Sequence, residues 1–346
     1  MRALTITGHG GVEQLAYRDD LPVPELRTPT DVRIRVQAAA LNHLDLYVLE
    51  GIPGVTLTPD WVVGTDAVGI VDAVGDRVEG VAPGDRVVVN AGLSDRTCEY
   101  CLDGEQPLCP KYRVMGEHVS GLAAEYVVVP ATNVLPIPDA IPSDIAGGFA
   151  LAAMTAWRMV VSRAQVTAED DVLIWGIGGG VAQMALQICK LRGAHVWVTS
   201  GSDEKLERAV AMGADETLNH RTQDVPAVIR EETRKRGVTV VVDSVGEATW
   251  DRSLRALGRR GRLVTCGGTS GPMVQTDVRR LFWNQWSLLG STMANDVEFA
   301  AVVEEFVARR LVPTVDSVHP LADGRAAYER LLSGEHFGKV VLQVEG

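Results

Sequence analysis

Residues 171 to 212 read DVLIWGIGGGVAQMALQICKLRGAHVWVTSGSDEKLERAVAM, and this stretch decides the fold of the middle of the chain. The apolar run 172–175 is suited to a buried parallel strand. Ala185, Ile188 and Leu191 then recur at helical spacing, and a second apolar run follows them. A strand, a helix and a second strand in this order predict a βαβ unit, which is how a chain builds a dinucleotide site.

A glycine-rich turn joins the first of these strands to the helix. It contains Gly176, Gly178, Gly179 and Gly180, and Val181 stands where the G-x-G-x-x-G pattern has its third glycine. Glycines let the backbone approach a pyrophosphate closely, and the N–H groups that open a helix favour the phosphate charge. A glycine turn alone is often only a tight turn. Its βαβ setting indicates a dinucleotide site, with these five residues as cofactor contacts.

The end of the second strand, expected at 195–199, indicates which dinucleotide is bound. An acid there would bind the ribose hydroxyls of NAD, and none is present. Instead Ser200 and Ser202 follow the strand, Lys205 lies in the next helix, and Arg221 is a second basic candidate. Small hydroxyl residues with a basic residue can hold a 2′-phosphate, so we expect NADPH. The alternative is that the serines only cap the helix, with Lys205 in solvent.

Length and composition limit the class of protein. A chain of 346 residues favours two domains, and 46% hydrophobic residues argue against disorder. The net charge of −12 disfavours nucleic acid and anionic membranes as partners, because both would repel an acidic surface. No apolar run approaches the length of a bilayer span, and the N-terminus lacks a signal or transit peptide, so we expect a cytoplasmic protein. Five cysteines, three of them clustered, do not suggest a disulfide framework.

The residue pattern changes twice along the chain. Residues 1 to about 150 contain valine-rich strands separated by glycine and proline turns, which predicts a mostly β region. The middle of the chain alternates strands with helices, and the tail changes pattern again and is expected to rejoin the first region. The predicted fold class is α/β, with a β-rich domain at 1–152 and 293–346 and a doubly wound Rossmann domain at 153–292. Its six expected strands are 172–175, 195–199, 217–218, 238–242, 262–266 and 287–290.

Short motifs over nearly the full length carry a resemblance to a known family. They are Asn42–Tyr47 (NHLDLY), Gly64–Gly69 (GTDAVG), Pro83–Val87 (PGDRV), Ala124–Tyr126 (AEY), Thr155–Trp157 (TAW), the glycine turn and Phe337–Leu342 (FGKVVL). On these motifs the chain resembles the medium-chain dehydrogenase/reductase superfamily, which implies that the β-rich domain is a GroES-like catalytic domain. It looks most like the quinone oxidoreductase branch, whose members reduce quinones or activated alkenes with NADPH and carry no catalytic zinc. It also resembles the zinc alcohol dehydrogenases through a cysteine-rich segment.

The resemblance implies further cofactor contacts. Thr155 is expected to approach the nicotinamide, and Lys339 is expected to lie against the pyrophosphate. The alternative for Lys339 is a solvated lysine in a closing strand. The other contacts are expected to end the fourth, fifth and sixth strands of the sheet, at the carboxyl ends where an open α/β sheet binds its ligand. They are Val245, Gly246, Gly267, Gly268, Thr269, Ser291 and Thr292.

The cysteine-rich segment, residues 92–110, suggests a metal site outside the reaction centre. Cys98 and Cys101 form a C-x2-C pair and Cys109 adds a third thiol, whereas tetrahedral zinc takes four ligands. Zinc alcohol dehydrogenases have a further cysteine three residues before the first of these, where this chain has Asp95, and a carboxylate can also ligate zinc. Structural zinc bound by these four residues is one interpretation. A lobe that has lost its metal and a redox role for reduced thiols remain open.

The catalytic zinc of the alcohol dehydrogenase branch has no obvious ligands in this chain. The resemblance places its three ligand positions on Asn42, Thr65 and Leu151. None of these residues is a strong zinc ligand, and leucine cannot ligate at all. We therefore expect chemistry that relies on the cofactor and on hydrogen bonds rather than on a metal.

Hydride transfer to an enone or a quinone leaves negative charge on oxygen, which hydrogen-bond donors must stabilise. The resemblance places Asn42 and Tyr47 around the nicotinamide, Asn42 as an amide donor and Tyr47 as a phenolic donor and proton source. His43 is expected beside the cofactor, and Asp45 is expected to order the loop. A buried Asp66 would need a metal or a basic partner. The alternatives are that Asn42 only satisfies backbone groups and that Tyr47 belongs to the core.

Residues 279–289 are unusually rich in aromatic side chains and lie near a terminal strand of the expected Rossmann sheet. Exposed sheet edges aggregate unless they are covered or paired. In this superfamily two such edges join across a dimer, so we expect a homodimer. The alternative is that Trp283 and Trp286 cap the core of one subunit.

The sequence therefore predicts an NADPH-dependent reductase of quinones or α,β-unsaturated carbonyls that works without catalytic zinc on a small-molecule substrate. A zinc-type alcohol dehydrogenase and a nucleotide-binding protein without turnover are the alternatives. The substrate itself is not readable, because the loops around 47–60, 110–122 and 270–295 match no motif.

Overall fold

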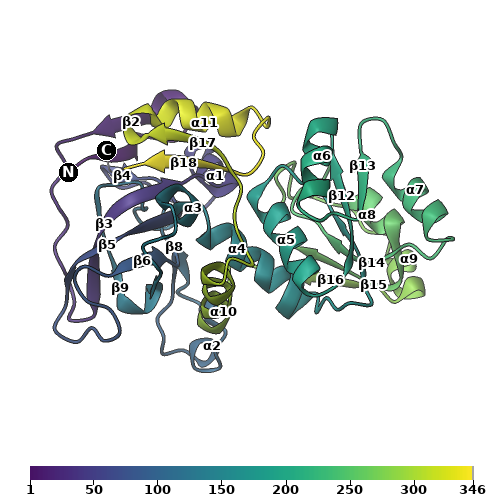
Figure 1. Cartoon of the computed structure of the whole chain (residues 1–346), viewed down its shortest axis with the longest axis horizontal. Helices are drawn as coiled ribbons and strands as arrows, with labels where there is room; N and C mark the ends of the chain where they lie inside the picture. The colour runs from purple at the N-terminus through teal and green to yellow at the C-terminus, as the bar shows by residue number, and fades with distance from the viewer. Residues whose placement is uncertain (345–346) are drawn as a thin grey trace. The chain divides into compact units, whose positions relative to one another are not determined.

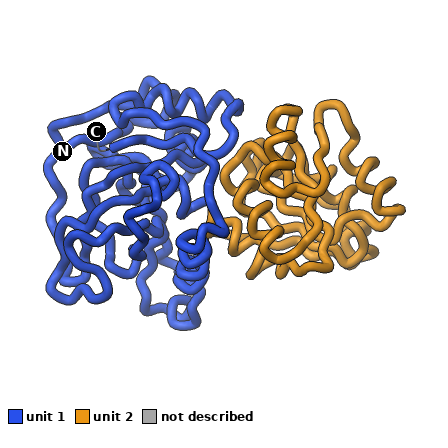
Figure 2. The backbone as a smooth tube through the Cα atoms, in the orientation of Figure 1, with its two compact units in different colours: residues 1–152, 294–346 blue, residues 153–293 orange. Residues whose placement is uncertain are grey.

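The computed structural model describes residues 1–344 and divides the chain into two compact units. Unit 1 is Met1–Ala152 with Ala294–Gly346, and unit 2 is Ala153–Met293 (Figure 2). Helix α4 (Ala150–Trp157) carries the chain out of unit 1, and a π-helical segment at Arg158–Arg163 follows it. Within residues 1–344, no helix is both long enough and apolar enough to cross a membrane.

Unit 2, drawn in teal to green in Figure 1, contains one parallel sheet with the strand order β13-β12-β11-β14-β15-β16. Successive strands are added toward one edge from β11 to β13 and toward the other edge from β14 to β16, so the order switches between β11 and β14. An open α/β sheet binds its ligand at such a switch point. The strands are β11 (Asp171–Ile174), β12 (His195–Ser200), β13 (Glu216–Asn219), β14 (Val238–Val242), β15 (Leu257–Thr265) and β16 (Ser287–Gly290). The helices are α5 (Gly180–Leu191), α6 (Asp203–Ala211), α7 (Val225–Glu232), α8 (Trp250–Ala256) and α9 (Val278–Asn284).

Apolar residues explain why this sheet forms. The β-branched runs of β11 and β14 are almost completely buried, as expected for strands covered on both faces. The buried stripe of α5 includes Ala182, Ala185 and Cys189, spaced three and four residues apart. Leu191 was expected on the same face as Ala185 but is 44% exposed. Six residues advance around a helix by about 600°, which is about 120° short of two full turns. The side chain of Leu191 therefore points in a direction about 120° away from that of Ala185.

Unit 1 is built around a seven-stranded sheet with the order β10-β6-β5-β3-β18-β17, and β9 also pairs with β3. Its strands are β3 (Asp31–Ala40), β5 (Asp66–Val74), β6 (Arg86–Val89), β9 (Tyr126–Pro130), β10 (Val134–Pro136), β17 (Val315–Pro320) and β18 (Lys339–Gln343). The smaller pairings use β1 (Ala3–Ile6), β2 (Leu15–Arg18), β4 (Trp61–Val62), β7 (Gly92–Leu93) and β8 (Arg113–Val114). The helices are α1 (His43–Glu50), α2 (Glu99–Leu102), α3 (Ser143–Gly147), α10 (Asp296–Val307) and α11 (Gly324–Leu332).

The C-terminal strand β18 places residue 339 next to a segment from the start of the chain. Strand β18 pairs antiparallel with β3, with Val341 opposite Ala40, and the N–H of Leu41 donates to the carbonyl of Val340. Gly338, just before β18, has a φ of +108°, and a Cβ there would lie 2.2 Å from the carbonyl oxygen of Thr314. Only glycine fits this close approach, so the start of β18 is held in one position.

Candidate functional site

The glycine turn of unit 2 is a tight, internally bonded loop between β11 and α5. Gly176 has a φ of +71°, and its N–H donates to Oγ1 of Thr199 on the neighbouring strand at 3.2 Å. The N–H of Ile177 donates to the carbonyl of Thr199, and that of Gly179 donates to the carbonyl of Gly176. Helix α5 therefore begins directly above the C-terminal edge of the sheet, as a dinucleotide site requires.

The space around the glycine turn is open, which fits a ligand. A Cβ on Gly176 would approach only Val245, at 3.8 Å, and a Cβ on Gly179 would approach only the carbonyl of Gly176, at 3.8 Å. Gly179 also has ordinary extended backbone angles. Packing within the protein therefore does not require glycine at position 179. Close approach of a phosphate to the backbone does provide a reason for it.

The end of β12 presents hydroxyl and basic residues. Ser200 Oγ accepts from the N–H of Ser202, and Ser202 Oγ accepts from the N–H of Lys205, so the serines do shape the start of α6. The guanidinium of Arg221 packs against the turn, because a Cβ on Gly201 would lie 2.6 Å from its Nε. The structure therefore brings Arg221 beside the two serines. The nearby acid Asp203 accepts from the side chain of Asn219 at 2.6 Å.

The loops after β14 and β15 lie against each other. The N–H of Thr269 donates to the carbonyl of Ser244, and that of Ser270 donates to the carbonyl of Val245. Gly246 has a φ of +87°, and a Cβ there would lie 2.5 Å from the carbonyl oxygen of Gly271 in the loop after β15. Val245, Gly246 and the group Gly267, Gly268 and Thr269 all follow their strands rather than ending them, as do Ser291 and Thr292 after β16. Thr155 is buried in α4.

Asp243 is a residue of this region that the sequence analysis missed. It is completely buried just after β14, and its carboxylate accepts from the N–H groups of Val245 and Gly246 and from the hydroxyls of Thr249 and Ser253. These bonds hold the loop that carries Val245. The only sequence signal for this role was a single aspartate directly after a valine-rich run. Acidic residues are common at strand ends, so this signal did not distinguish Asp243 from others.

In unit 1, Lys339 is buried between a carboxamide and a carboxylate. Its Nζ donates to Oδ1 of Asn42 at 2.5 Å and to Oδ2 of Asp66 at 3.0 Å. Lys339 is 3% exposed and Asp66 is fully buried. Asp66 therefore has the basic partner that its burial demands. The second oxygen of Asp66 accepts from the N–H of Leu151 at 2.7 Å.

The amide nitrogen of Asn42 is also fully engaged. Its Nδ2 donates to Oγ1 of Thr65 at 2.8 Å and to Oδ2 of Asp66 at 3.0 Å. An amide nitrogen carries two protons, and these two bonds use both. The orientation of the amide is also determined, because an ammonium can only donate and must face the carbonyl oxygen.

Asp45 accepts hydrogen bonds from the segments on either side of this cluster. Its carboxylate accepts from the N–H of Asn42 at 2.7 Å and from that of Gly64 at 3.1 Å. The hydroxyl of Thr65 lies 3.5 Å from the same carboxylate. Burial raises the pKa of Asp45 to about 7, and the charge of Asp66 acts in the same direction, although the N–H of Asn42 and the charge of Lys339 oppose it.

The two other predicted residues of this segment lie on α1. His43 is exposed at the first position of the helix, and its ring centroid lies 6.2 Å from that of His336. Tyr47 is half-buried one turn later. Tyr328 on α11, which the sequence did not single out, is fully buried near Asp45. Burial and then the negative charge of Asp45 raise the pKa of its hydroxyl.

The residues at the expected catalytic-metal positions do not fit a zinc ion. Asn42 turns its carbonyl oxygen to Lys339, Thr65 offers a hydroxyl bonded to Asn42, and Leu151 offers hydrocarbon. Zinc prefers thiolate, imidazole and carboxylate ligands, and a neighbouring ammonium would repel a divalent cation. Among residues 1–344, the only group of three or more acidic, cysteine or histidine side chains arranged to hold a metal lies elsewhere.

That group consists of Asp95, Cys98, Cys101 and Cys109. Their ligand atoms all lie within 4.8 Å of one another, and the two sulfurs of the C-x2-C pair are 3.5 Å apart. A tetrahedron with Zn–S bonds of about 2.3 Å has edges of about 3.8 Å, so the four residues fit a zinc ion. Asp95 is oriented by the N–H groups of Thr97 and Cys98, and Cys109 accepts from the N–H groups of Asp95 and Lys111.

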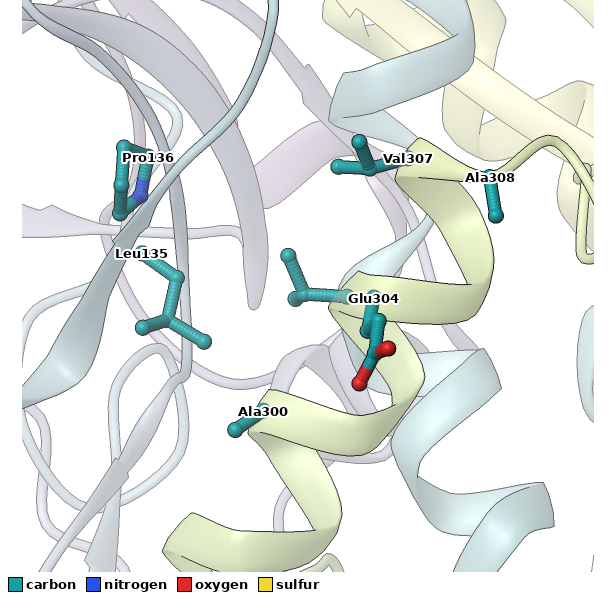
Figure 3. Close-up of a pocket in the computed structure, with 7 residues that line it drawn as sticks. Leu135, Pro136, Ala300, Glu304, Val307 and Ala308 are labelled. Carbon is teal, nitrogen blue, oxygen red and sulfur yellow. The ribbon is translucent and has the colours of Figure 1, made fainter.

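The metal-binding lobe is tied to the first turn of α10. Arg96, between two of the four ligand residues, forms an ion pair with Asp296, and the side chain of Gln106 accepts from the N–H of Asp296. Later turns of α10 line an open groove of about 450 Å³ with Leu135 and Pro136 (Figure 3). The groove is apolar apart from Glu304 and contains none of the predicted site residues.

Comparison with known proteins identifies the family. The model for the alcohol dehydrogenase GroES-like domain matches residues 28–139, and the model for zinc-binding dehydrogenases matches residues 180–308. A crystal structure of an NAD-dependent alcohol dehydrogenase is 43% identical, with complete coverage of both chains and a TM-score of 0.95. The chain belongs to the medium-chain dehydrogenase/reductase superfamily. It is an oxidoreductase of the medium-chain type with a GroES-like domain and a Rossmann-type domain.

Relatives of this superfamily member differ in their named reactions. The zinc-type alcohol dehydrogenase-like protein of Schizosaccharomyces pombe is 31% identical, with 97% of this chain and 96% of that protein covered. The acryloyl-coenzyme A reductase of Metallosphaera sedula is 29% identical, with 99% of each chain covered. Overall similarity therefore does not choose between alcohol oxidation and reduction of an activated alkene, and the site residues have to decide.

We expect Gly179→Ala to separate cofactor binding from folding. The free energy of unfolding should change by less than about 0.5 kcal/mol, because the backbone at 179 suits alanine and the new methyl group meets open space. Binding of NADPH, measured by fluorescence titration, should weaken by about tenfold or more because the methyl group occupies the phosphate's place. The control Gly8→Ala should change neither quantity. Unchanged NADPH binding in Gly179→Ala would place the phosphate elsewhere.

We expect about one zinc ion per chain, held in the lobe. Removing it should lower the free energy of unfolding by about 3 kcal/mol, the value for a ligand present at one hundred times its Kd. Elemental analysis should show the metal lost in Cys101→Ser and Asp95→Ala, and kept in Asp95→Cys and in the control Cys189→Ala. Two tightly held zinc ions per chain would contradict our account of Asn42, Thr65 and Leu151.

Proposed function

We propose that the protein is an NADPH-dependent reductase of quinones or α,β-unsaturated carbonyls that transfers hydride without catalytic zinc. The observation that carries this proposal is the closed network of Asn42, Thr65, Asp66 and Lys339 at the positions where the alcohol dehydrogenase branch binds its metal. Activated alkenes and quinones accept hydride without a Lewis acid, since conjugation spreads the charge. A simple carbonyl or alcohol lacks that help and depends on a metal or on another strong electrophile.

The residues of unit 2 fit a nicotinamide dinucleotide, which would supply the hydride when bound. The N–H groups at the start of α5 and the open glycine turn would hold the pyrophosphate. Ser200, Ser202, Lys205 and Arg221 would hold the 2′-phosphate that distinguishes NADPH from NADH. Thr155, Val245 and the residues after β15 and β16 would contact the nicotinamide half.

The residues of unit 1 would complete the reaction. Asp45 holds Asn42, Gly64 and Thr65 in place through three hydrogen bonds. Tyr47, on the first helix of this unit, would hold the proton that the reduced substrate takes up after hydride transfer. His43 is exposed on the same helix and would border the substrate or cofactor.

The second candidate function is alcohol oxidation, which the names of several relatives favour. It would require a metal or another strong electrophile at Asn42, Thr65 and Leu151, and the network there opposes it. A nucleotide-binding protein without turnover is a third candidate. The ordered cluster in unit 1 argues against it, because a buried ammonium and two buried carboxylates are costly to keep without a chemical role.

We expect the purified protein to oxidise NADPH in the presence of enones or quinones, and to retain this activity when a chelator is added. Tyr47→Phe should lower kcat by about 10²-fold, because the proton source is lost. The measurement is steady-state NADPH oxidation against a panel of quinones, enones, aldehydes and ketones. Chelator-sensitive alcohol oxidation, with no reduction of any enone or quinone, would decide for the alcohol dehydrogenase function.

We expect NADPH to bind more tightly than NADH. Lys205→Ala and Arg221→Ala should each weaken NADPH binding by 1.5 to 3 kcal/mol, about 10- to 100-fold, because a charge-assisted hydrogen bond to the 2′-phosphate is lost. NADH binding should stay within about twofold of the parent value. Arg208→Ala, on the same helix, is the control and should leave both unchanged. Equal affinity of the parent protein for the two cofactors would refute this assignment.

We also propose that two copies of the chain form a homodimer through β16. This strand lies at the edge of the six-stranded sheet. Trp286 is 8% exposed and donates to the carbonyl of Gly258, so it caps the core. Trp283 is 74% exposed and Phe282 is 62% exposed beside the edge strand, which suits an interface. Sedimentation should give twice the chain mass of 37.2 kDa, and a monomer at micromolar concentration would rule the dimer out.

A further inference from the structure

The loop after β15 is largely exposed, and hydrogen bonds attach it to the loop after β14. The N–H of Thr269 donates to the carbonyl of Ser244, and both the N–H and the hydroxyl of Ser270 donate to the carbonyl of Val245. The same hydroxyl of Ser270 accepts from the N–H of Ala248 at 2.9 Å. The position of the loop after β15 therefore depends on the position of the loop after β14.

The loop after β14 is held in turn by the carboxylate of Asp243. Its Oδ1 accepts from the N–H groups of Val245 at 2.9 Å and Gly246 at 3.1 Å. Its Oδ2 accepts from the hydroxyl of Ser253 at 2.6 Å, and the hydroxyl of Thr249 lies within 2.9 Å of both oxygens. Because Asp243 is completely buried, these donors would lose their partner if the carboxylate were removed.

We infer that Asp243 is a positioning residue for the nicotinamide half of the cofactor. This inference rests on the proposed function, in which Val245 and the residues after β15 contact that half. Asp243 acts through the two bonded loops and touches neither the cofactor nor the substrate. Loops that are fixed beforehand need not be ordered when the cofactor binds, which is how preorganisation raises affinity.

The adenosine half of the candidate cofactor site is held by other contacts. The N–H groups of Gly176 and Ile177 in the glycine turn donate to Thr199 on β12. The two serines after β12 bond to backbone N–H groups at the start of α6. Loss of the Asp243 carboxylate should therefore affect one half of the dinucleotide and spare the other, which a general loss of stability would not do.

Asp243→Ala tests this separation by isothermal titration calorimetry. The dissociation constant for NADPH should rise by about tenfold or more, because the loosened loops must be ordered at the moment of binding. The constant for adenosine 2′,5′-bisphosphate, which carries only the adenosine half, should stay within about twofold, because its contacts are independent of Asp243. Asp243→Asn keeps one oxygen for the two N–H groups and should recover most of the NADPH affinity, since the facing hydroxyls can rotate to accept from its amide.

Asp170→Ala is the matched control. Asp170 is a buried carboxylate directly before β11, at the other edge of the same sheet, and it also accepts from a backbone N–H and from hydroxyls, those of Thr167 and Thr239. Its loss should lower the free energy of unfolding without changing the ratio of the two dissociation constants. If Asp243→Ala weakens NADPH and the bisphosphate equally, Asp243 has only a structural role and the inference is overturned.

Ser270→Ala tests the same connection if Asp243→Ala folds poorly. Ser270 is exposed, and its hydroxyl supplies two of the bonds between the loops. Its loss should weaken NADPH binding by about threefold and spare adenosine 2′,5′-bisphosphate. Ser333→Ala is the control, because that exposed hydroxyl in unit 1 also donates to a carbonyl and accepts from an N–H. An unchanged NADPH affinity in Ser270→Ala overturns the inference.

These measurements follow binding rather than turnover, so the inference and the proposed function can fail separately. A parent protein that reduces no quinone or enone, but shows the separation between NADPH and its adenosine half, overturns the proposed reaction and leaves the role of Asp243 standing. A parent protein that binds neither NADPH nor NADH overturns both.

Discussion

The burial of the Lys339 ammonium is the constraint on which the arrangement of unit 1 depends. Lys339 is 3% exposed, and burying its charge without a partner would cost the folded protein several kcal/mol of stability. Asp66 and Asn42 must therefore lie within hydrogen-bond distance of its ammonium. Asp66 is held by the N–H of Leu151, and Asn42 is held by Thr65 and by Asp45. One charge thus organises residues from the start, the middle and the end of the chain.

The same cluster differs in its chemistry from a catalytic metal site. A catalytic metal needs soft or anionic ligands around an open position. This chain has an amide, a hydroxyl and hydrocarbon there, and the amide is bonded to a cation. The cysteine lobe holds four side chains arranged so that they could bind a metal, and it shares no residue with this cluster.

The candidate nucleotide site of unit 2 is formed mainly by backbone groups rather than by side chains. The glycine turn, the bonds from its N–H groups to Thr199 and the start of α5 create an open cradle with donors at its base. Hydroxyl and basic side chains at the end of β12 lie beside this backbone cradle. Arg221 illustrates the point, since it comes from the loop after β13 yet packs on the turn after β12.

The sequence by itself determined the architecture of unit 2. Parallel strands buried on both faces require continuous apolar runs, and these runs and the glycine-rich turn can be recognised directly in the sequence. It also determined the four candidate ligands of the metal lobe, which lie within fifteen residues of one another, and the need of a buried Asp66 for a metal or a basic partner. Tertiary structure alone decided that the partner is a base, and which base it is. Lys339 is 273 residues away from Asp66, and only the pairing of β18 with β3 brings them together. The sequence also could not show that both amide protons of Asn42 are used in hydrogen bonds to Thr65 and Asp66. The number of free donors on a side chain depends on which neighbours the fold brings to it.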